Sequence, residues 1–197
     1  MASESSELAA KVQRSIERFY RLERGPSVRS FLRPTEPGER ESLRLRQAED
    51  GAVEIEVSAP LLSPHPDLDD LCQIIEGVSH FVYVAERARC RRPTTHLELE
   101  LQAEVDKYVL LVLGKERVDR GFARSVHRQL YEHVRFAHPE GSEDGDRYRL
   151  ANELAARLVR RIELRFAEAG RRGAMRDVLS RFYRMGQAEK IQFARAA

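Results

Sequence analysis

The chain has 197 residues, 42% of them hydrophobic, and its 34 basic and 32 acidic residues leave a net charge of +2. A chain of this length can bury about 70% of the surface exposed on unfolding, so we expect one domain over residues 1–197. The balanced charge does not by itself indicate nucleic acid, two cysteines make no disulfide framework, and no apolar run approaches a membrane span of ~20 residues. The N-terminus also lacks the segments of a signal peptide. These observations predict a cytoplasmic protein without a membrane role.

The first predicted helix covers residues 5–24, where apolar side chains recur at helical spacing. Gly25 and Pro26 end it. Residues 1–24 form either an arm or a part of the core, and the sequence leaves this open. Residues 25–41, rich in proline and glycine, are predicted to be a loop.

Residues 42–58 predict a β-hairpin, because apolar side chains alternate first with arginines and then with glutamates. A three-residue loop, Glu49-Asp50-Gly51, pairs Leu45 with Ile55 and places the apolar side chains on one face. A one-residue slip would move all of them to the other face. The outer face then becomes a ladder of arginine and glutamate.

A short helix is expected near residues 67–76, with Gly77 at its C-terminal end. The apolar run at 78–88 predicts a strand buried on both faces, the third in an antiparallel sheet with the hairpin. Residues 42–88 are therefore the predicted sheet-containing part of the chain.

Residues 95–113 allow two interpretations. Leucines alternate with acids at the start of this segment, which is the period of a strand. The residues are strong helix formers, Thr95 and Glu98 have the spacing of a capping box, and the segment is too long for a usual strand. We therefore predict a helix.

The rest of residues 95–197 is predicted to be helical, with breaks at loops rich in glycine. The expected helices cover residues 118–136, 146–169, 174–185 and 187–195. The predicted fold is a predominantly helical α+β domain, in which several helices cover a small antiparallel sheet.

Three polar residues fall among apolar ones and are the candidates for catalysis. Glu104 lies in the apolar arc of the 95–113 helix, His133 in that of the 118–136 helix, and His80 in the predicted strand. A carboxylate with two imidazoles can act as acid and base or hold a divalent metal. Because no diagnostic spacing accompanies them, a buried ion pair of Glu104 with Arg161 or Arg165 is the favoured interpretation. We predict no metal and no cofactor.

Two arginine clusters are the candidates for binding. Arg91 and Arg92 lead into the N-terminus of the 95–113 helix, where free backbone N–H groups can bind an anion, although a solvated charged segment is the favoured interpretation. Residues 155–186 carry nine arginines against three acids. The binding candidates in this second cluster are Arg171, Arg172, Arg176, Arg181 and Arg184.

The expected function is that of a non-enzymatic, regulatory or interaction protein, with an acidic protein partner on the arginine-rich C-terminal helices. Two alternatives stay open. The same helices could bind nucleic acid, or the glutamate and histidines could form a metal-dependent active site.

Overall fold

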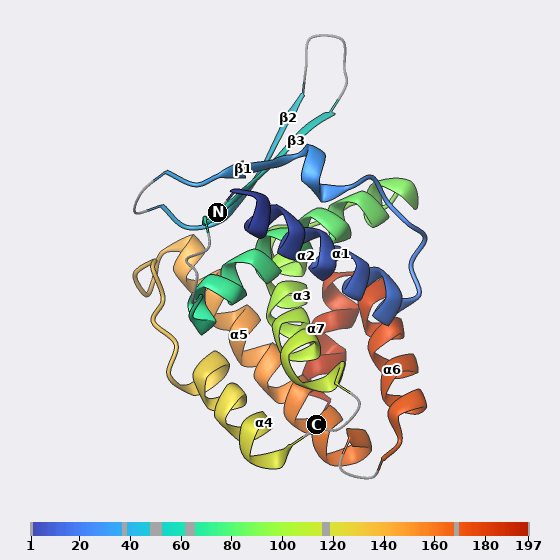
Figure 1. Ribbon diagram of the computed structural model, residues 1–197. Helices are drawn as coiled ribbons and strands as arrows, with labels where there is room; N and C mark the ends of the chain where they lie inside the picture. Colours follow the sequence, from blue (N-terminus) through green and yellow to red (C-terminus); the bar gives the residue numbers. More distant parts are fainter. Residues whose placement is uncertain are drawn as a thin grey trace. The chain divides into compact units, whose positions relative to one another are not determined.

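The computed structural model describes residues 2–36, 39–47, 53–61, 66–115, 119–167 and 170–196. Within these ranges, seven α-helices accompany one three-stranded sheet (Figure 1), which confirms the predominantly helical α+β class. The chain divides into two compact units, which we describe separately. The first unit holds residues 1–18 and 22–92, and the second holds residues 19–21 and 93–197. The division after residue 92 falls between the predicted sheet-containing part and the predicted helical part.

The first unit contains the sheet, most of helix α1 and helix α2. The elements in chain order are α1 (Ala2–Tyr20), a 3-10 turn η1 (Val28–Ser30), β1 (Leu32–Pro34), β2 (Ser42–Gln47), β3 (Val53–Ala59) and α2 (Leu68–Arg89). Helix α1 ends four residues before the predicted boundary, and its side chains Val12 and Ile16 are buried.

The predicted hairpin and its register are confirmed. Strands β2 and β3 are antiparallel, with Leu45 opposite Ile55 and Arg46 opposite Glu54. Arg44 faces Glu56, with 3.9 Å between the guanidinium and the carboxylate. The predicted loop Glu49-Asp50-Gly51 lies outside the described residues.

The prediction of a purely antiparallel sheet is wrong. The strand order is β1-β3-β2, and β1 runs parallel to β3, with Leu32 opposite Val57. The third strand therefore comes from residues 32–34, inside the segment predicted to be a loop. The sheet is mixed.

Helix α2 replaces two predicted elements, the helix at 67–76 and the strand at 78–88. It begins with a capping box in which the Asp67 carboxylate accepts from the Asp70 N–H, and the Asp70 carboxylate accepts from the Asp67 N–H. Gly77 lies in the helix interior rather than at its end. A Cβ atom at Gly77 would lie 3.2 Å from Val57 Cγ1, so the glycine allows α2 to pack closely on β3.

The second unit is helical, as predicted for residues 95–197. Its helices are α3 (His96–Tyr108), α4 (Arg120–His127), α5 (Glu143–Ile162), α6 (Arg172–Arg184) and α7 (Gln187–Arg195). Three of them continue as π-helical turns: α3 into η2 (Val109–Leu113), α4 into η3 (Arg128–Glu132) and α5 into η4 (Glu163–Ala167). Helix α3 packs against α5 and α7 (Figure 1).

The capping box predicted for α3 is confirmed. The Thr95 hydroxyl accepts from the Glu98 N–H at 3.2 Å, and the Glu98 carboxylate accepts from the Thr95 N–H at 2.8 Å. Throughout the described ranges, no helix combines the length and apolar character needed to cross a bilayer.

Candidate functional site

Glu104 is not at the centre of a buried site. Its carboxylate accepts hydrogen bonds from the Lys107 ammonium at 2.7 Å and from the Asn152 amide at 3.3 Å. Its side chain keeps 15% of its exposure, and the described contacts include neither Arg161 nor Arg165. The expected pairing with an arginine is thus replaced by a pairing with the lysine one turn further along the same helix.

The two histidines named with Glu104 lie in different parts of the chain. His133 follows η3 in the second unit and is exposed, so it does not join Glu104 in a buried cluster. His80 is buried in α2 of the first unit.

The two arginines expected near Glu104 have other surroundings. Arg165 is exposed, and its guanidinium lies 5.5 Å from the ring centre of Phe166. Arg161 donates to the carbonyls of Phe193 and Ala196 at the end of α7. Burial, and next the charge of Arg165, lower the pKa of Arg161. Arg161 therefore joins α5 to α7.

The most buried polar cluster of the second unit was not predicted. It consists of Tyr20, Gln102, Asp106 and Lys190, all with 0% exposure. The Tyr20 hydroxyl donates to Asp106 Oδ1 at 2.5 Å, and the Gln102 amide donates to the same oxygen at 2.8 Å. Burial, followed by the neighbouring Asp106 carboxylate, raises the pKa of Tyr20.

Lys190 extends this buried cluster from α7. Its ammonium donates to the Gln102 carbonyl oxygen and lies 4.3 Å from the ring centre of Phe182. An ammonium over an aromatic face is stabilised by the ring quadrupole, most strongly where water is excluded. Because every member is fully buried, the cluster orients helices and has no surface on which to meet a substrate.

A second polar contact lies where the π-helical turns begin. Tyr108, the last residue of α3, donates through its hydroxyl to Glu163 Oε1 at 3.0 Å. Burial, and next the charge of Glu163, raise the pKa of Tyr108. The His127 ring lies edge-on to Tyr108 and to Tyr131. π-helical turns often mark functional sites. Here Tyr108, His127 and Tyr131 make an aromatic packing contact.

The five arginines predicted on the C-terminal helices play two different roles. Arg176 and Arg184 donate to the carbonyls of Phe19 and Tyr20, at 2.6 and 3.3 Å, and so satisfy the C-terminal end of α1. Arg172 donates to the Leu113 carbonyl at 3.4 Å. Arg171 and Arg181 are exposed, and their side chains have no partner among the described residues.

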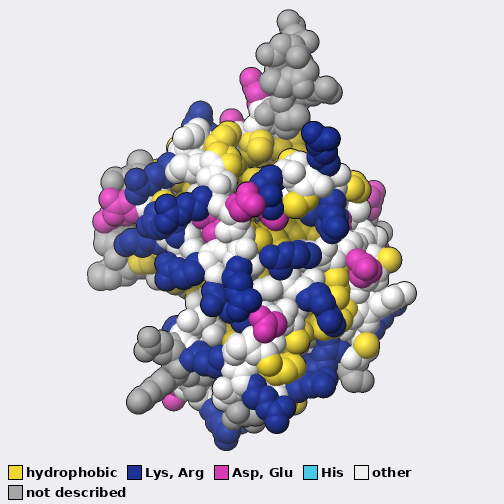
Figure 2. Space-filling view, turned by 90° about the vertical axis from the view of Figure 1, so that its right-hand side faces the viewer, with side chains coloured by type: hydrophobic (Ala, Val, Ile, Leu, Met, Phe, Trp, Pro, Cys, Tyr) yellow, Lys and Arg dark blue, Asp and Glu magenta, His cyan; other side chains and the backbone are white. Residues whose placement is uncertain are grey.

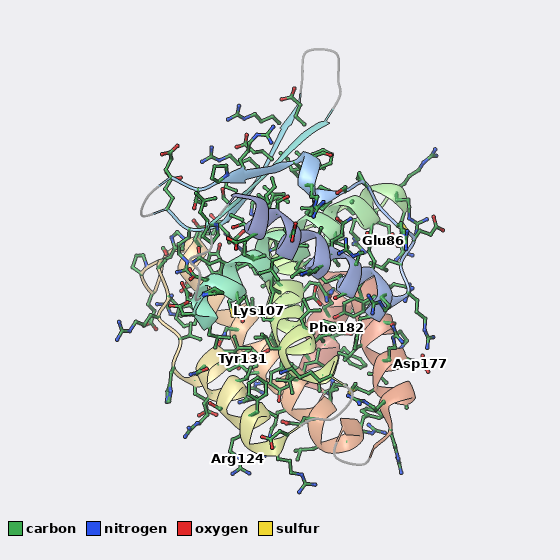
Figure 3. All side chains as sticks on the ribbon, in the orientation of Figure 1. Glu86, Lys107, Arg124, Tyr131, Asp177 and Phe182 are labelled. Atoms are coloured by element: carbon green, nitrogen blue, oxygen red, sulfur yellow. The ribbon has the colours of Figure 1, made fainter. Side chains whose placement is uncertain are left out.

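The outer side of α6 forms what we call the basic face. We define it by the exposed side chains Arg181 and Arg184 with Asp177 on α6, by Arg171 at the N-terminal end of the helix, and by Arg21. Asp177, Arg181 and Arg184 follow one another at helical spacing, so they share one side of the helix. Figure 3 places Asp177 on the outer side of α6 and Phe182 on its inner side. Figure 2, turned toward the side on which α6 lies in Figure 1, shows basic side chains spread over much of that view.

The remaining predicted arginines, Arg91 and Arg92, are exposed at the end of α2 in the first unit. Arg91 has a φ of 51°, a left-handed backbone that residues other than glycine adopt at a cost. The Arg92 N–H donates to the Arg87 carbonyl at 2.9 Å, which closes the helix end.

One sequence signal pointed to the buried cluster without identifying it. The segments at 18–21 and 181–184 both read Arg-Phe-Tyr-Arg. In the structure the rings of Tyr20 and Tyr183 lie 4.4 Å apart, so the two segments meet in the second unit.

Comparison with protein-family models, curated proteins and solved structures finds no match to this chain. Its function must therefore be inferred from its own residues.

Proposed function

We propose that this chain is a non-enzymatic interaction protein that binds an acidic protein partner through the basic face of α6. The observation that carries the proposal is the ion pair of Asp177, the one acidic residue in the sequence of α6. Its carboxylate lies 3.1 Å from the Arg21 guanidinium. The single negative charge on this face is therefore already matched, while Arg171 and Arg181 are available to a partner.

Arginine suits this role because its planar guanidinium can bind a carboxylate through two parallel hydrogen bonds. Arg176 and Arg172 each donate to a backbone carbonyl, which ties their side chains to the protein. We therefore assign the direct contacts to Arg171 and Arg181, with Arg184 and Arg21 beside them. Cys72 and Cys90 are not joined in a disulfide, which favours a reducing compartment, and we propose a cytoplasmic location.

An acidic protein is favoured over single-stranded nucleic acid because α6 offers no exposed aromatic ring. Phe182 is fully buried and Tyr183 is 1% exposed. Proteins that bind single strands stack bases on exposed aromatic rings, and neither ring is accessible for this. Duplex nucleic acid, which needs only phosphate contacts, is tested in the same experiment.

The test compares two double charge reversals. Arg171→Glu with Arg181→Glu removes the free donors of the basic face. Arg124→Glu with Arg128→Glu makes the same change in net charge at exposed positions of α4 and η3. The probes are a labelled poly-glutamate peptide of about 20 residues, which can span the ~20 Å of α6, and duplex DNA of about 20 base pairs.

We expect the wild-type chain to bind poly-glutamate more tightly than duplex DNA at low salt, as measured by fluorescence anisotropy. The α6 reversal should weaken this binding at least about tenfold, which corresponds to about 1.4 kcal/mol. The α4 reversal should change it by no more than about threefold. Equal losses in the two variants would contradict the proposal, and tighter binding of duplex DNA would support the nucleic-acid alternative instead.

A further inference from the structure

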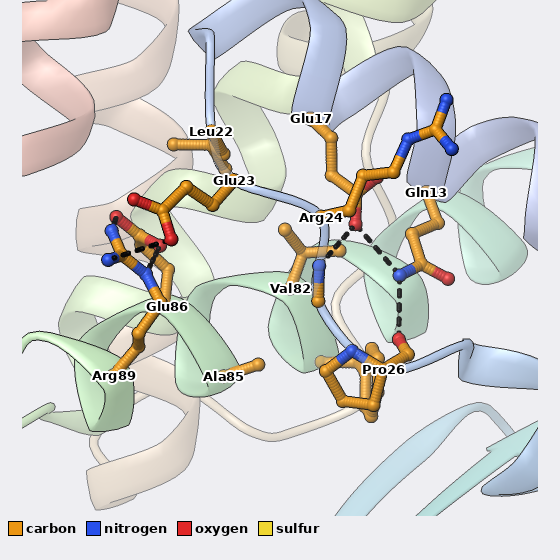
Figure 4. Close-up of a pocket in the computed structure, with 12 residues that line it drawn as sticks. Gln13, Glu17, Leu22, Glu23, Arg24, Pro26, Val82, Ala85, Glu86 and Arg89 are labelled. Atoms are coloured by element: carbon orange, nitrogen blue, oxygen red, sulfur yellow. Dashed lines mark hydrogen bonds and ion pairs between the residues drawn. The ribbon is translucent and has the colours of Figure 1, made fainter.

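The first unit contains a pocket between α1, the segment that follows it, and α2 (Figure 4). Its volume is about 190 Å³. The pocket is smaller than the ~300–1,000 Å³ of drug-sized sites and slightly larger than a cavity of ~150 Å³ that holds benzene. It can therefore accept a ligand of about six to eight non-hydrogen atoms.

The floor of the pocket is apolar. Phe81, Val82 and Ala85 come from α2, and Leu22 and Pro26 come from the segment after α1. Such a floor favours a ligand with an aliphatic stem, because each buried methylene group contributes about 0.8 kcal/mol by transfer from water.

Three glutamates line the pocket, Glu17, Glu23 and Glu86, and Glu17 is buried, with only 7% exposure. Its Oε1 accepts from the Gln13 amide at 2.9 Å and from the Gly25 N–H at 3.2 Å. Both donors are neutral, and among the described residues no cationic side chain pairs with Glu17. A buried carboxylate without a cation is unfavourable, because neutral donors replace its hydration only in part.

The Glu17 carboxylate is held in place by its neighbours. Gln13 donates to the Pro26 carbonyl at 2.8 Å, and its amide oxygen accepts from the Val28 N–H at 2.9 Å. These hydrogen bonds fix residues 25–28 against α1. The pocket is thus formed before any ligand enters, which lowers the entropy cost of binding.

The other charges at the pocket do not neutralise Glu17. Arg89 is paired with Glu86 at 2.8 Å and with Glu23 at 3.3 Å. Arg24, the second basic residue of the lining, extends its guanidinium away from Val82 and Ala85 (Figure 4). The interior of the pocket therefore presents a carboxylate above an apolar floor.

We propose that this pocket binds a small organic cation, a primary ammonium or guanidinium on an aliphatic stem of about four or five carbons. The cationic head pairs with Glu17, and the stem lies on Val82 and Ala85. This inference concerns the first unit and is independent of the partner proposed for α6. The cation is either a free amine or the side chain of a lysine or arginine from another protein, since both present the same chemistry.

The test is a titration of the full chain followed by amide chemical shifts in NMR spectra. The probes are n-pentylamine, n-butylguanidine and the neutral analogue 1-pentanol. We expect at least one of the two cations to bind the wild-type chain with Kd on the order of 1 mM, as a ligand this small allows. The alcohol should bind at least about tenfold more weakly. Equal affinity for the alcohol and the cations, or no shifts at about 10 mM of either cation, would overturn the proposal.

Two variants and one control locate the site. Glu17→Gln keeps an acceptor for the Gly25 N–H and should weaken cation binding at least about tenfold. Ala85→Leu fills the pocket, leaves Glu17 unchanged and should abolish binding. With two variants, the test does not depend on the folding of either one. Glu7→Gln, at an exposed position of the same helix α1, should bind as the wild type does. Unchanged binding in Ala85→Leu, or in Glu17→Gln, would overturn the assignment.

A final probe separates the two sources of the cation. The peptide acetyl-Gly-Lys-Gly-amide carries the same ammonium on a stem attached to a backbone. Binding of this peptide as tightly as n-pentylamine supports a protein side chain as the occupant. Binding of n-pentylamine alone supports a free amine.

Discussion

Two buried tyrosine hydroxyls of the second unit donate to carboxylates, Tyr20 to Asp106 and Tyr108 to Glu163. The pKa of each tyrosine is raised, with burial as the main cause. Unfolded tyrosines ionise near pH 10. Above that pH the unfolded chain therefore binds fewer protons than the folded chain, and the free energy of unfolding falls as pH rises.

This linkage makes a prediction for Tyr20→Phe. At neutral pH the substitution should lower the free energy of unfolding by about 1–3 kcal/mol, because Asp106 loses a donor in a buried place. Above about pH 10 the variant should lose stability less steeply than the wild type, by up to about 1.4 kcal/mol per pH unit. Urea unfolding at about pH 8 and pH 10.5 measures both effects.

Tyr108→Phe is the matched comparison for this experiment. Above about pH 10 this variant should also lose unfolding free energy less steeply than the wild type. The double variant should lose it less steeply still. If Tyr20→Phe lost unfolding free energy above pH 10 as steeply as the wild type, the pKa of Tyr20 would be the same in the folded and the unfolded chain.

The backbone of Arg91 supports a second prediction at the level of single residues. Arg91 holds a left-handed conformation with φ of 51°, at a position where helices usually place glycine. Left-handed backbone costs an L-residue about 1–2 kcal/mol, and the extra freedom of unfolded glycine offsets part of that gain. Arg91→Gly should therefore raise the free energy of unfolding by roughly 0.5–1 kcal/mol.

Chemical denaturation of Arg91→Gly and Arg92→Gly checks this expectation. Arg92 has no positive φ, so its replacement by glycine should not stabilise the chain. A loss of stability in Arg91→Gly as large as that in Arg92→Gly would contradict the argument from backbone strain.

At the scale of elements, the start of α3 depends on its capping box. Thr95→Ala removes the hydroxyl that accepts from the Glu98 N–H. We expect a loss of about 1 kcal/mol in the free energy of unfolding, within the usual range of about 0.5–2 kcal/mol for an N-cap. Thr95→Ser should recover most of it.

Thr94→Ala, one residue before the cap, is the control in the same thermal or urea unfolding experiment. It should change stability by less than about 0.5 kcal/mol. If Thr94→Ala cost as much as Thr95→Ala, the effect would not come from the cap.

How far these elements could be predicted depended on the kind of signal that each carries. The hairpin register was predictable because a slip of one residue moves every apolar side chain to the other face. The prediction of a strand at 78–88 was wrong because a short apolar run fits a buried strand and a buried helix equally well. The three residues of β1 were too few to show any period.

Glu104 is less buried than its position in the apolar arc predicted, for a reason that lies in α3. The prediction assumed a helix with one apolar arc and placed Glu104 inside that arc. Helix α3 is instead buried on nearly all sides, so Gln102 and Asp106 are 0% exposed while Glu104 keeps part of its exposure. Periodicity cannot identify the buried polar residues of a helix that is surrounded by others.

At the scale of the whole molecule, the division into units does not follow the chain order. Residues 19–21 group with residues 93–197, although the rest of α1 belongs to the first unit. Tyr20 brings its hydroxyl to Asp106 and its ring to Tyr183. A short segment near the N-terminus therefore completes the core of the second unit.

This grouping predicts where a substitution in α1 has its effect. Tyr20→Ala removes a large buried ring and should cost about 3–5 kcal/mol. Hydrogen exchange measured by mass spectrometry should show faster exchange in α3 and α6. Ile16→Ala, at a buried position one turn earlier, should act mainly on peptides of the first unit. The same exchange pattern in both variants would contradict the grouping.

The place of Tyr20 also sets the order of events during synthesis on the ribosome. Tyr20 is added to the chain well before its partners Asp106 and Tyr183. At about 5–20 residues per second, Tyr183 is added roughly 8–33 s after Tyr20. During that interval the end of α1 has to remain without its final contacts. We therefore expect the second unit to complete its folding only after Tyr183 has been added.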